Sequence, residues 1–226
     1  MSDASEPYRF ADELPLNPIA LGTTVLVAGS ALSGAEDVTR ALVTEGNSRD
    51  EGMLFVSTNE TAEKLLAACQ RTTSSIDTAR LGIIDCSGQA IEPSDTGMRV
   101  KYVSTQRDLT GIGMKYSALY QALYADTADG RVRTGLLSLS SLLMYVDLRQ
   151  LFQFAHTLSG RISSADGIGA FYIDPTAHDT ASVNTLTQLA DGRIDIRETD
   201  DADADGELRV RKLPDQPDGW QPFTLP

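Results

Sequence analysis

Short apolar runs alternate with amphipathic segments along this chain. The runs are rich in β-branched residues and close at small or polar residues, as buried β-strands do. They predict strands over 23–29, 53–58, 81–86, 100–104, 134–143, 167–174, 193–197 and 208–213. Apolar residues recur at helical spacing over 34–44, 61–70, 147–163 and 179–189, and again in a segment that follows a glycine-rich turn at 110–113.

This alternation is typical of an α/β protein with a mainly parallel sheet covered by helices on both faces. We therefore predict a three-layer fold, with antiparallel strands near the C-terminus and 208–213 as an edge strand beyond an acidic loop at 200–207. In such a sheet, a ligand binds at loops that follow the carboxyl ends of strands. The loop after the first strand is the first place to look for a site.

One predicted helix carries a stripe of tyrosines. Tyr116, Tyr120 and Tyr124 follow one another at intervals of four residues, so their side chains share one helix face. We interpret this face as packed against the body of the protein, with a binding face as the alternative.

Composition sets the broad class. With 226 residues and 41% hydrophobic residues, the chain can bury a core of ordinary size. Asp plus Glu is 32 against 19 for Lys plus Arg, a formal charge of -13, which argues against nucleic-acid binding and against docking on anionic membranes. No apolar run approaches the roughly 20 residues of a membrane-spanning helix, and the first ten residues lack the pattern of a signal peptide. We expect a cytoplasmic protein.

The balance of charges has a second reading. Only four of the 19 basic residues are lysines, and aspartates are spread along the chain. An acidic, lysine-poor surface suits a protein that stays soluble in concentrated salt, which favours a halophilic source. An ordinary acidic protein is the alternative.

Cysteine and histidine usage predicts no metal site. Cys69 and Cys86 match no metal-binding spacing and stand among apolar residues, so we expect buried thiols. The two histidines, His156 and His178, are too few to complete a zinc site with them.

The loop after the first strand has two glycines at the spacing of a phosphate-binding P-loop. Its residues are Gly29, Ser30, Ala31, Leu32, Ser33, Gly34, Ala35 and Glu36. In the pattern G-x-x-x-x-G-K-[ST], the lysine reaches the phosphates and the hydroxyl binds Mg²⁺. Gly29 and Gly34 match, but Ala35 stands at the lysine position and Glu36 at the hydroxyl position.

Each replacement weakens phosphate binding. A lysine hydrogen bond to phosphate is worth about 1.5–3 kcal/mol. A carboxylate about 4 Å from a phosphate charge repels it by about 4 kcal/mol at an effective dielectric constant near 20. The loop backbone and the helix N-terminus could still hold an anion weakly, and Glu36 could alternatively capture a metal ion.

With this loop in its context, the chain resembles the RecA/KaiC-type P-loop ATPase superfamily, and more closely small haloarchaeal KaiC-like proteins of unassigned function. The likeness covers about 14–198 and is carried by PLNPIALGTTVLVAGSALSGAEDVTRALV, MLFVSTNETAEKLL, TGIGMKYSALYQAL and RTGLLSLSSLLMYVDLRQLFQFAHTLSGRISSADGIGAFYIDPTAHD. It implies a RecA-like domain over 14–198, a lead-in over 1–13, and a C-terminal extension over 199–226 that packs on the domain.

The resemblance also locates the superfamily's functional positions. The Walker B aspartate falls on Leu137, and the acidic pair that supplies the catalytic base falls on Asn59 and Glu60, so a single carboxylate remains. Glu60 is a weak catalytic candidate, and we favour reading it as an acid in the first turn of the next helix. Asp147 is better read as a helix N-cap and Asp174 as a loop residue at a strand end than as a displaced Walker B aspartate.

These losses predict a degenerate, catalytically inactive domain. Phosphoryl transfer depends on positioning and on charge neutralisation by lysine and Mg²⁺. We expect no cofactor, and a regulatory role carried out through protein partners in a halophilic archaeon. The alternative is an ATP/Mg²⁺-binding ATPase or switch that uses Glu60, and a DNA-acting recombinase relative is disfavoured by the acidic surface. The superfamily's head-to-tail assembly leaves a homo-oligomer open.

Overall fold

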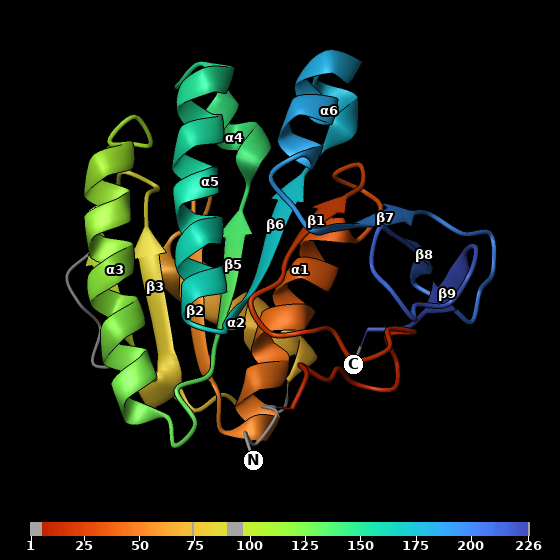
Figure 1. The fold of residues 1–226 in the computed structure, drawn as a ribbon, viewed down its shortest axis with the longest axis horizontal. Helices are drawn as coiled ribbons and strands as arrows, with labels where there is room; N and C mark the ends of the chain where they lie inside the picture. The colour runs from red at the N-terminus through yellow and green to blue at the C-terminus, as the bar shows by residue number, and fades with distance from the viewer. Residues whose placement is uncertain (1–5, 74, 90–96, 226) are drawn as a thin grey trace.

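The computed structural model describes residues 6–73, 75–89 and 97–225, which form one nine-stranded sheet (Figure 1). The strand order across the sheet is β4-β3-β2-β5-β6-β1-β7-β8-β9. The strands are β1 Thr24–Ala28, β2 Gly52–Ser57, β3 Leu81–Asp85, β4 Arg99–Tyr102, β5 Val132–Leu137, β6 Ile168–Ile173, β7 Gly192–Arg197, β8 Gly206–Arg211 and β9 Gln221–Phe223.

Seven of these strands are parallel, and the last two are antiparallel. Every neighbouring pair from β4 to β7 is parallel, whereas β8 pairs antiparallel with β7 and β9 antiparallel with β8. The mainly parallel sheet with antiparallel strands at the C-terminus, predicted from the sequence, is confirmed. The predicted edge position of 208–213 is wrong, because β9 covers β8 and forms the edge itself.

Helices cover both faces of the sheet and complete three layers (Figure 1). The cores on the two sides of the sheet contain different helices. One side has α1 Ala35–Thr44 and α2 Ala62–Thr72; the other has α3 Leu109–Asp126, α4 Leu139–Leu143, α5 Leu148–Ser164 and α6 Thr180–Thr187. Short 3-10 turns lie at Glu45–Arg49, Thr78–Arg80 and Pro175–Ala177. Within the described residues, no helix combines the length and the apolar character that crossing a bilayer requires.

Two predicted elements differ from the observed ones. The strand expected over 134–143 ends at Leu137, because the Ser138 side chain accepts hydrogen bonds from two following amides and starts α4. The glycine-rich turn expected at 110–113 lies inside the first turn of α3, where the Asp108 carboxylate accepts a hydrogen bond from the Gly111 amide at 2.8 Å. In both places, a side-chain cap outweighs the local pattern.

The tyrosine stripe of α3 is buried in part. Tyr116 and Tyr120 are buried, as the prediction of a packed face requires, whereas Tyr124 is 48% exposed. Cys69 and Cys86 are both buried as predicted, and burial raises the pKa of each thiol to about 12.

A buried ion pair joins the amino end of the sheet to the segment that precedes β1. Arg133 of β5 is fully buried and pairs with Glu51, which also forms an ion pair with Arg131 at 2.9 Å. The Arg133 guanidinium donates to the carbonyl oxygens of Leu42 and Arg9, each at 2.9 Å. It therefore connects β5 with α1 and with the N-terminal segment.

Aromatic residues of that N-terminal segment complete the cluster. The Tyr8 ring lies under the guanidinium groups of Arg131 and Arg133, at 4.2 and 5.1 Å from its centroid, and Phe10 lies 5.3 Å from Arg133. A β-bridge pairs Tyr8 with Ile19. Burial raises the pKa of Tyr8 to about 12, so the phenol stays neutral.

We expect Glu51→Gln to lower the free energy of unfolding by about 3–5 kcal/mol, because it leaves the charge of Arg133 buried without a counter-ion. Asp50→Asn is the matched control: the adjacent Asp50 pairs with Arg80 at the exposed surface, where a pair is worth less than about 1 kcal/mol. Urea unfolding monitored by circular dichroism measures both. Equal losses for the two variants would contradict this account.

Candidate functional site at the carboxyl end of the sheet

The loop over 29–36 joins a buried central strand to a helix, as a P-loop does. It follows β1, which lies between β6 and β7, and its last two residues, Ala35 and Glu36, are the first two residues of α1. The loop, the end of β2 and the end of β6 lie at the carboxyl edge of the parallel sheet, where ligands bind in this class of fold.

Both glycines of the loop have a structural reason that involves no phosphate, which is backbone conformation at Gly34 and close packing at Gly29. Gly34 has φ 77°, a left-handed conformation that favours glycine. A Cβ on Gly29 would lie 2.8 Å from the Cβ of Ala35 and 2.9 Å from the carbonyl oxygen of Ile196. Ala35 is itself fully buried, so the position of the P-loop lysine is part of the core.

Hydrogen bonds inside the protein occupy three of the loop amides, the first of which is that of Gly29, which donates to the carbonyl oxygen of Ile173 at 3.3 Å. The amide and the hydroxyl of Ser33 both donate to the carbonyl oxygen of Ser30, at 3.0 and 2.8 Å. The amide of Ala31 donates to a carboxylate oxygen of Asp174, at 3.2 Å. The other oxygen of Asp174 accepts from the amide and the hydroxyl of Thr176, at 2.8 and 2.6 Å. The carboxylate of Asp174, at the end of β6, thus contacts this loop. In a P-loop protein, the corresponding loop contacts phosphate.

A second group of acids surrounds Arg40, one turn into α1. Its guanidinium contacts Glu36 at 2.6 Å, Asp37 at 2.7 Å and Glu60 at 3.1 Å. Arg40 is 8% exposed, so this single buried cation serves three carboxylates. Glu36, at the position of the Mg²⁺-binding hydroxyl, is therefore held in an ion pair.

The half-buried Glu60 has a perturbed acidity. Burial raises its pKa; Arg40 opposes that shift, and the neighbouring Glu36 carboxylate adds to it. The interpretation of Glu60 as a first-turn acid of α2 is wrong, because the helix begins after the N-cap Thr61 and its first-turn acid is Glu63. The structure instead places Glu60 against α1.

The other predicted positions lie as follows. Leu137, at the Walker B position, is buried at the end of β5. Asp147 caps α5 in a capping box with Gln150, as predicted. Asp174 is a loop residue at the end of β6, also as predicted. Among the described residues, no group of three or more His, Cys, Asp or Glu side chains is arranged to hold a metal ion.

Sequence analysis missed Arg40 and the contact made by Asp174. Arg40 had a local signal, since it follows Asp37 by three residues and Glu36 by four, which places all three on one helix face. Asp174 had none for its contact with Ala31, because the two residues are 143 positions apart and meet only when β6 pairs with β1.

Comparisons with known proteins agree with this geometry. A family model described as a family of unknown function, DUF7504, matches residues 22–196. No curated protein sequence matches the chain. Among solved structures, the chain resembles a KaiC-like protein from the hyperthermophilic archaeon Pyrococcus horikoshii, with a TM-score of 0.66, 14% sequence identity, and coverage of 96% of this chain and 91% of that chain. At this identity the likeness concerns the fold alone, and it confirms the RecA/KaiC-like fold predicted from the sequence.

Arg40→Gln should lower the free energy of unfolding by about 2 kcal/mol at pH 7, because three carboxylates lose their shared cation. The raised pKa of Glu60 sets the sign of the pH dependence. Arg40 lowers the pKa of Glu60 against the effect of burial, so removing Arg40 raises that pKa further. Because a carboxyl with a raised folded-state pKa stabilises the fold when protonated, the variant gains more stability than the parent as the pH falls, and the deficit should shrink between pH 7 and pH 5.

Urea unfolding at the two pH values measures this effect. Arg40→Gln/Glu60→Gln should recover part of the loss at pH 7. Arg49→Gln, which breaks the exposed pair with Glu45, is the matched control and should change stability by less than about 1 kcal/mol at either pH. If the loss of unfolding free energy in Arg40→Gln grew between pH 7 and pH 5, the raised pKa of Glu60 beside Arg40 would be contradicted.

Proposed function

This chain belongs to the family of unknown function DUF7504, and we propose that it is a catalytically inactive RecA/KaiC-like domain that acts as a regulatory protein-interaction module. The observation that carries the proposal is the hydrogen bond from the Ala31 amide to the Asp174 carboxylate. A negatively charged side chain contacts the loop at the place where an active relative would hold a phosphate, and the protein itself supplies it.

Electrostatics at this edge of the sheet support the same conclusion. Glu36, Asp37 and Glu60 share one guanidinium, so their group keeps a negative charge even when Arg40 is counted. A triphosphate brought within about 4 Å of an unpaired carboxylate meets a repulsion of about 4 kcal/mol per charge pair at an effective dielectric constant near 20. The lysine that would offset this repulsion is replaced by the buried Ala35.

The alternative function is a nucleotide-dependent ATPase or switch, and one observation favours it. Burial raises the pKa of Glu60, and a carboxylate of raised pKa suits general-base catalysis. That route requires Glu60 to leave Arg40 and to face a water beside a bound nucleotide. We favour the inactive domain, because the ion pairs of Arg40 occupy both Glu36 and Glu60.

The setting of this module follows from its charge. We propose that it works in the cytoplasm of a halophilic archaeon, where a net charge of -13 keeps it soluble in concentrated salt. The same charge disfavours nucleic acid as its ligand. Protein partners, including further copies of this chain, remain the class of ligand that we propose.

Calorimetric titration with ATP and Mg²⁺, at low and high KCl, tests the proposal. The parent protein should show no binding. Ala35→Lys/Glu36→Thr should bind Mg²⁺–ATP, because it restores the phosphate-binding lysine and the metal-binding hydroxyl. The position of Ala35 in the core makes that variant sensitive to folding, so Glu36→Thr/Asp174→Asn provides a second route that removes two carboxylates without adding bulk.

Asp166→Asn is the matched control, since Asp166 precedes β6 as Asp174 follows it and lies at the opposite edge of the sheet. It should leave the parent's lack of binding unchanged. Mg²⁺-dependent ATP binding by the parent would reject the inactive domain, and ATP hydrolysis that is lost in Glu60→Gln would assign the ATPase alternative.

A further inference from the structure

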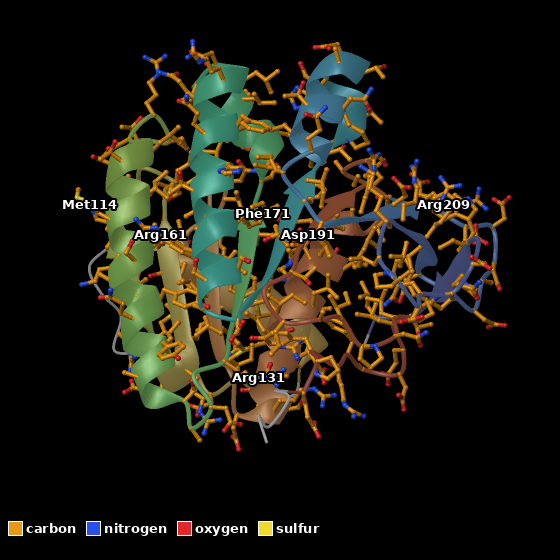
Figure 2. All side chains as sticks on the ribbon, in the orientation of Figure 1. Met114, Arg131, Arg161, Phe171, Asp191 and Arg209 are labelled. Atoms are coloured by element: carbon orange, nitrogen blue, oxygen red, sulfur yellow. The ribbon has the colours of Figure 1, made fainter. Side chains whose placement is uncertain are left out.

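A groove runs between α3 and α5 on the outer face of the protein, away from the candidate site. Figure 1 shows these helices side by side on one face of the sheet, and Figure 2 labels Arg161 between them. The groove consists of two adjoining hollows of about 510 and 630 Å³, which share Thr157 and Arg161 as lining residues. Its floor includes the rings of Tyr116 and Tyr120, whose centroids are 5.6 Å apart.

Small residues line both walls at the same spacing. Gly113 and Ser117 of α3 are four residues apart, as are Gly160 and Ser164 of α5. Each serine hydroxyl donates to the carbonyl oxygen of the glycine before it, at 2.7 Å, so its polar group is satisfied within its own helix. A Cβ added to either glycine meets no atom within 4 Å. The helix backbones are therefore open to close approach by another element.

The charge of this face is opposite to that of the rest of the chain. The sequence has 32 acids, yet α3 and α5 together contain a single one, Asp126, at the end of α3. Arg107 and Arg161 line the groove, and neither forms an ion pair with the described residues. The one carboxylate in the lining, Asp108, accepts from the Gly111 amide as the cap of α3.

We propose that this groove binds an acidic amphipathic helix of a partner protein. Apolar side chains of the guest would pack on the exposed Met114 and on the partly buried Leu109 and Val146. Its backbone would approach the glycines and serines of the two helices, and its carboxylates would pair with Arg107 and Arg161. The inference rests on the proposed role as an interaction module and adds the chemistry of the partner. It uses the face of the sheet opposite to α1 and the Arg40 cluster.

Synthetic helices provide the probe. Fluorescein-labelled 18-residue peptides would carry leucines on one face and either glutamates or lysines on the other, and binding would be followed by fluorescence anisotropy without nucleotide. The glutamate peptide should bind at least tenfold more tightly than the lysine peptide. Arg161→Glu should weaken its binding at least tenfold, whereas Arg149→Glu, an exposed change on the same helix outside the groove, should alter it less than twofold.

Filling the groove gives an independent measurement. Gly160→Phe should abolish binding of the glutamate peptide. The midpoint of its thermal unfolding should match or exceed that of the parent, because glycine is a poor helix former and a Cβ at position 160 meets no atom within 4 Å. The proposal is overturned if no peptide binds at 100 μM, if both peptides bind equally, or if Gly160→Phe leaves binding intact. A parent dimer that Gly160→Phe dissociates would assign the groove to a second copy of the chain instead.

The two proposals fail separately. ATP binding by the parent would refute the inactive domain while leaving the peptide result unchanged. Failure of the peptides would reject the groove while leaving the calorimetric result unchanged.

Discussion

The buried pair of Glu51 and Arg133 is the constraint on which the amino end of this fold depends. A guanidinium with no solvent contact is tolerated only when its charge is paired and its hydrogen bonds are made. Arg133 meets that requirement with partners from three places in the chain: the residue before β2, the end of α1, and the N-terminal segment, which supplies the Arg9 carbonyl oxygen and the Tyr8 ring. These elements must therefore assemble together around β5, which lies in the middle of the sheet.

The carboxyl end of the sheet is organised by a different kind of charge balance. Acids outnumber cations there, and each is held by a hydrogen bond or an ion pair: Asp174 by the Ala31 and Thr176 amides, and Glu36 and Glu60 by Arg40. In an active P-loop protein, phosphate and Mg²⁺ would meet lysine and a hydroxyl at this place. Here these side chains are paired with groups of the protein itself, and the buried Ala35 and the ion-paired Glu36 stand at the lysine and hydroxyl positions.

Several features of the β1–α1 connection have structural reasons that do not involve a nucleotide. The sheet, the left-handed turn at Gly34 and the close packing at Gly29 are needed for the β1–α1 connection itself, so they persist without a nucleotide. The open face between α3 and α5 lies on the other side of the sheet from α1, and the two helices contain a single acid, in contrast to the rest of the chain. A fold of this class does not by itself specify a function, so the function has to be argued from surfaces and sites.

The sequence by itself determined the class of fold, the position of the P-loop-like turn and the loss of its lysine and hydroxyl, because these depend on local periodicity and on residue identity at fixed spacing. It also identified the cap at Asp147, since capping is local. Only the tertiary structure decided that 134–143 divides at Ser138, that Asp174 contacts Ala31 and that Glu60 pairs with Arg40. Contacts between residues far apart in the chain arise from strand order and register, which no local pattern of apolar and polar residues specifies.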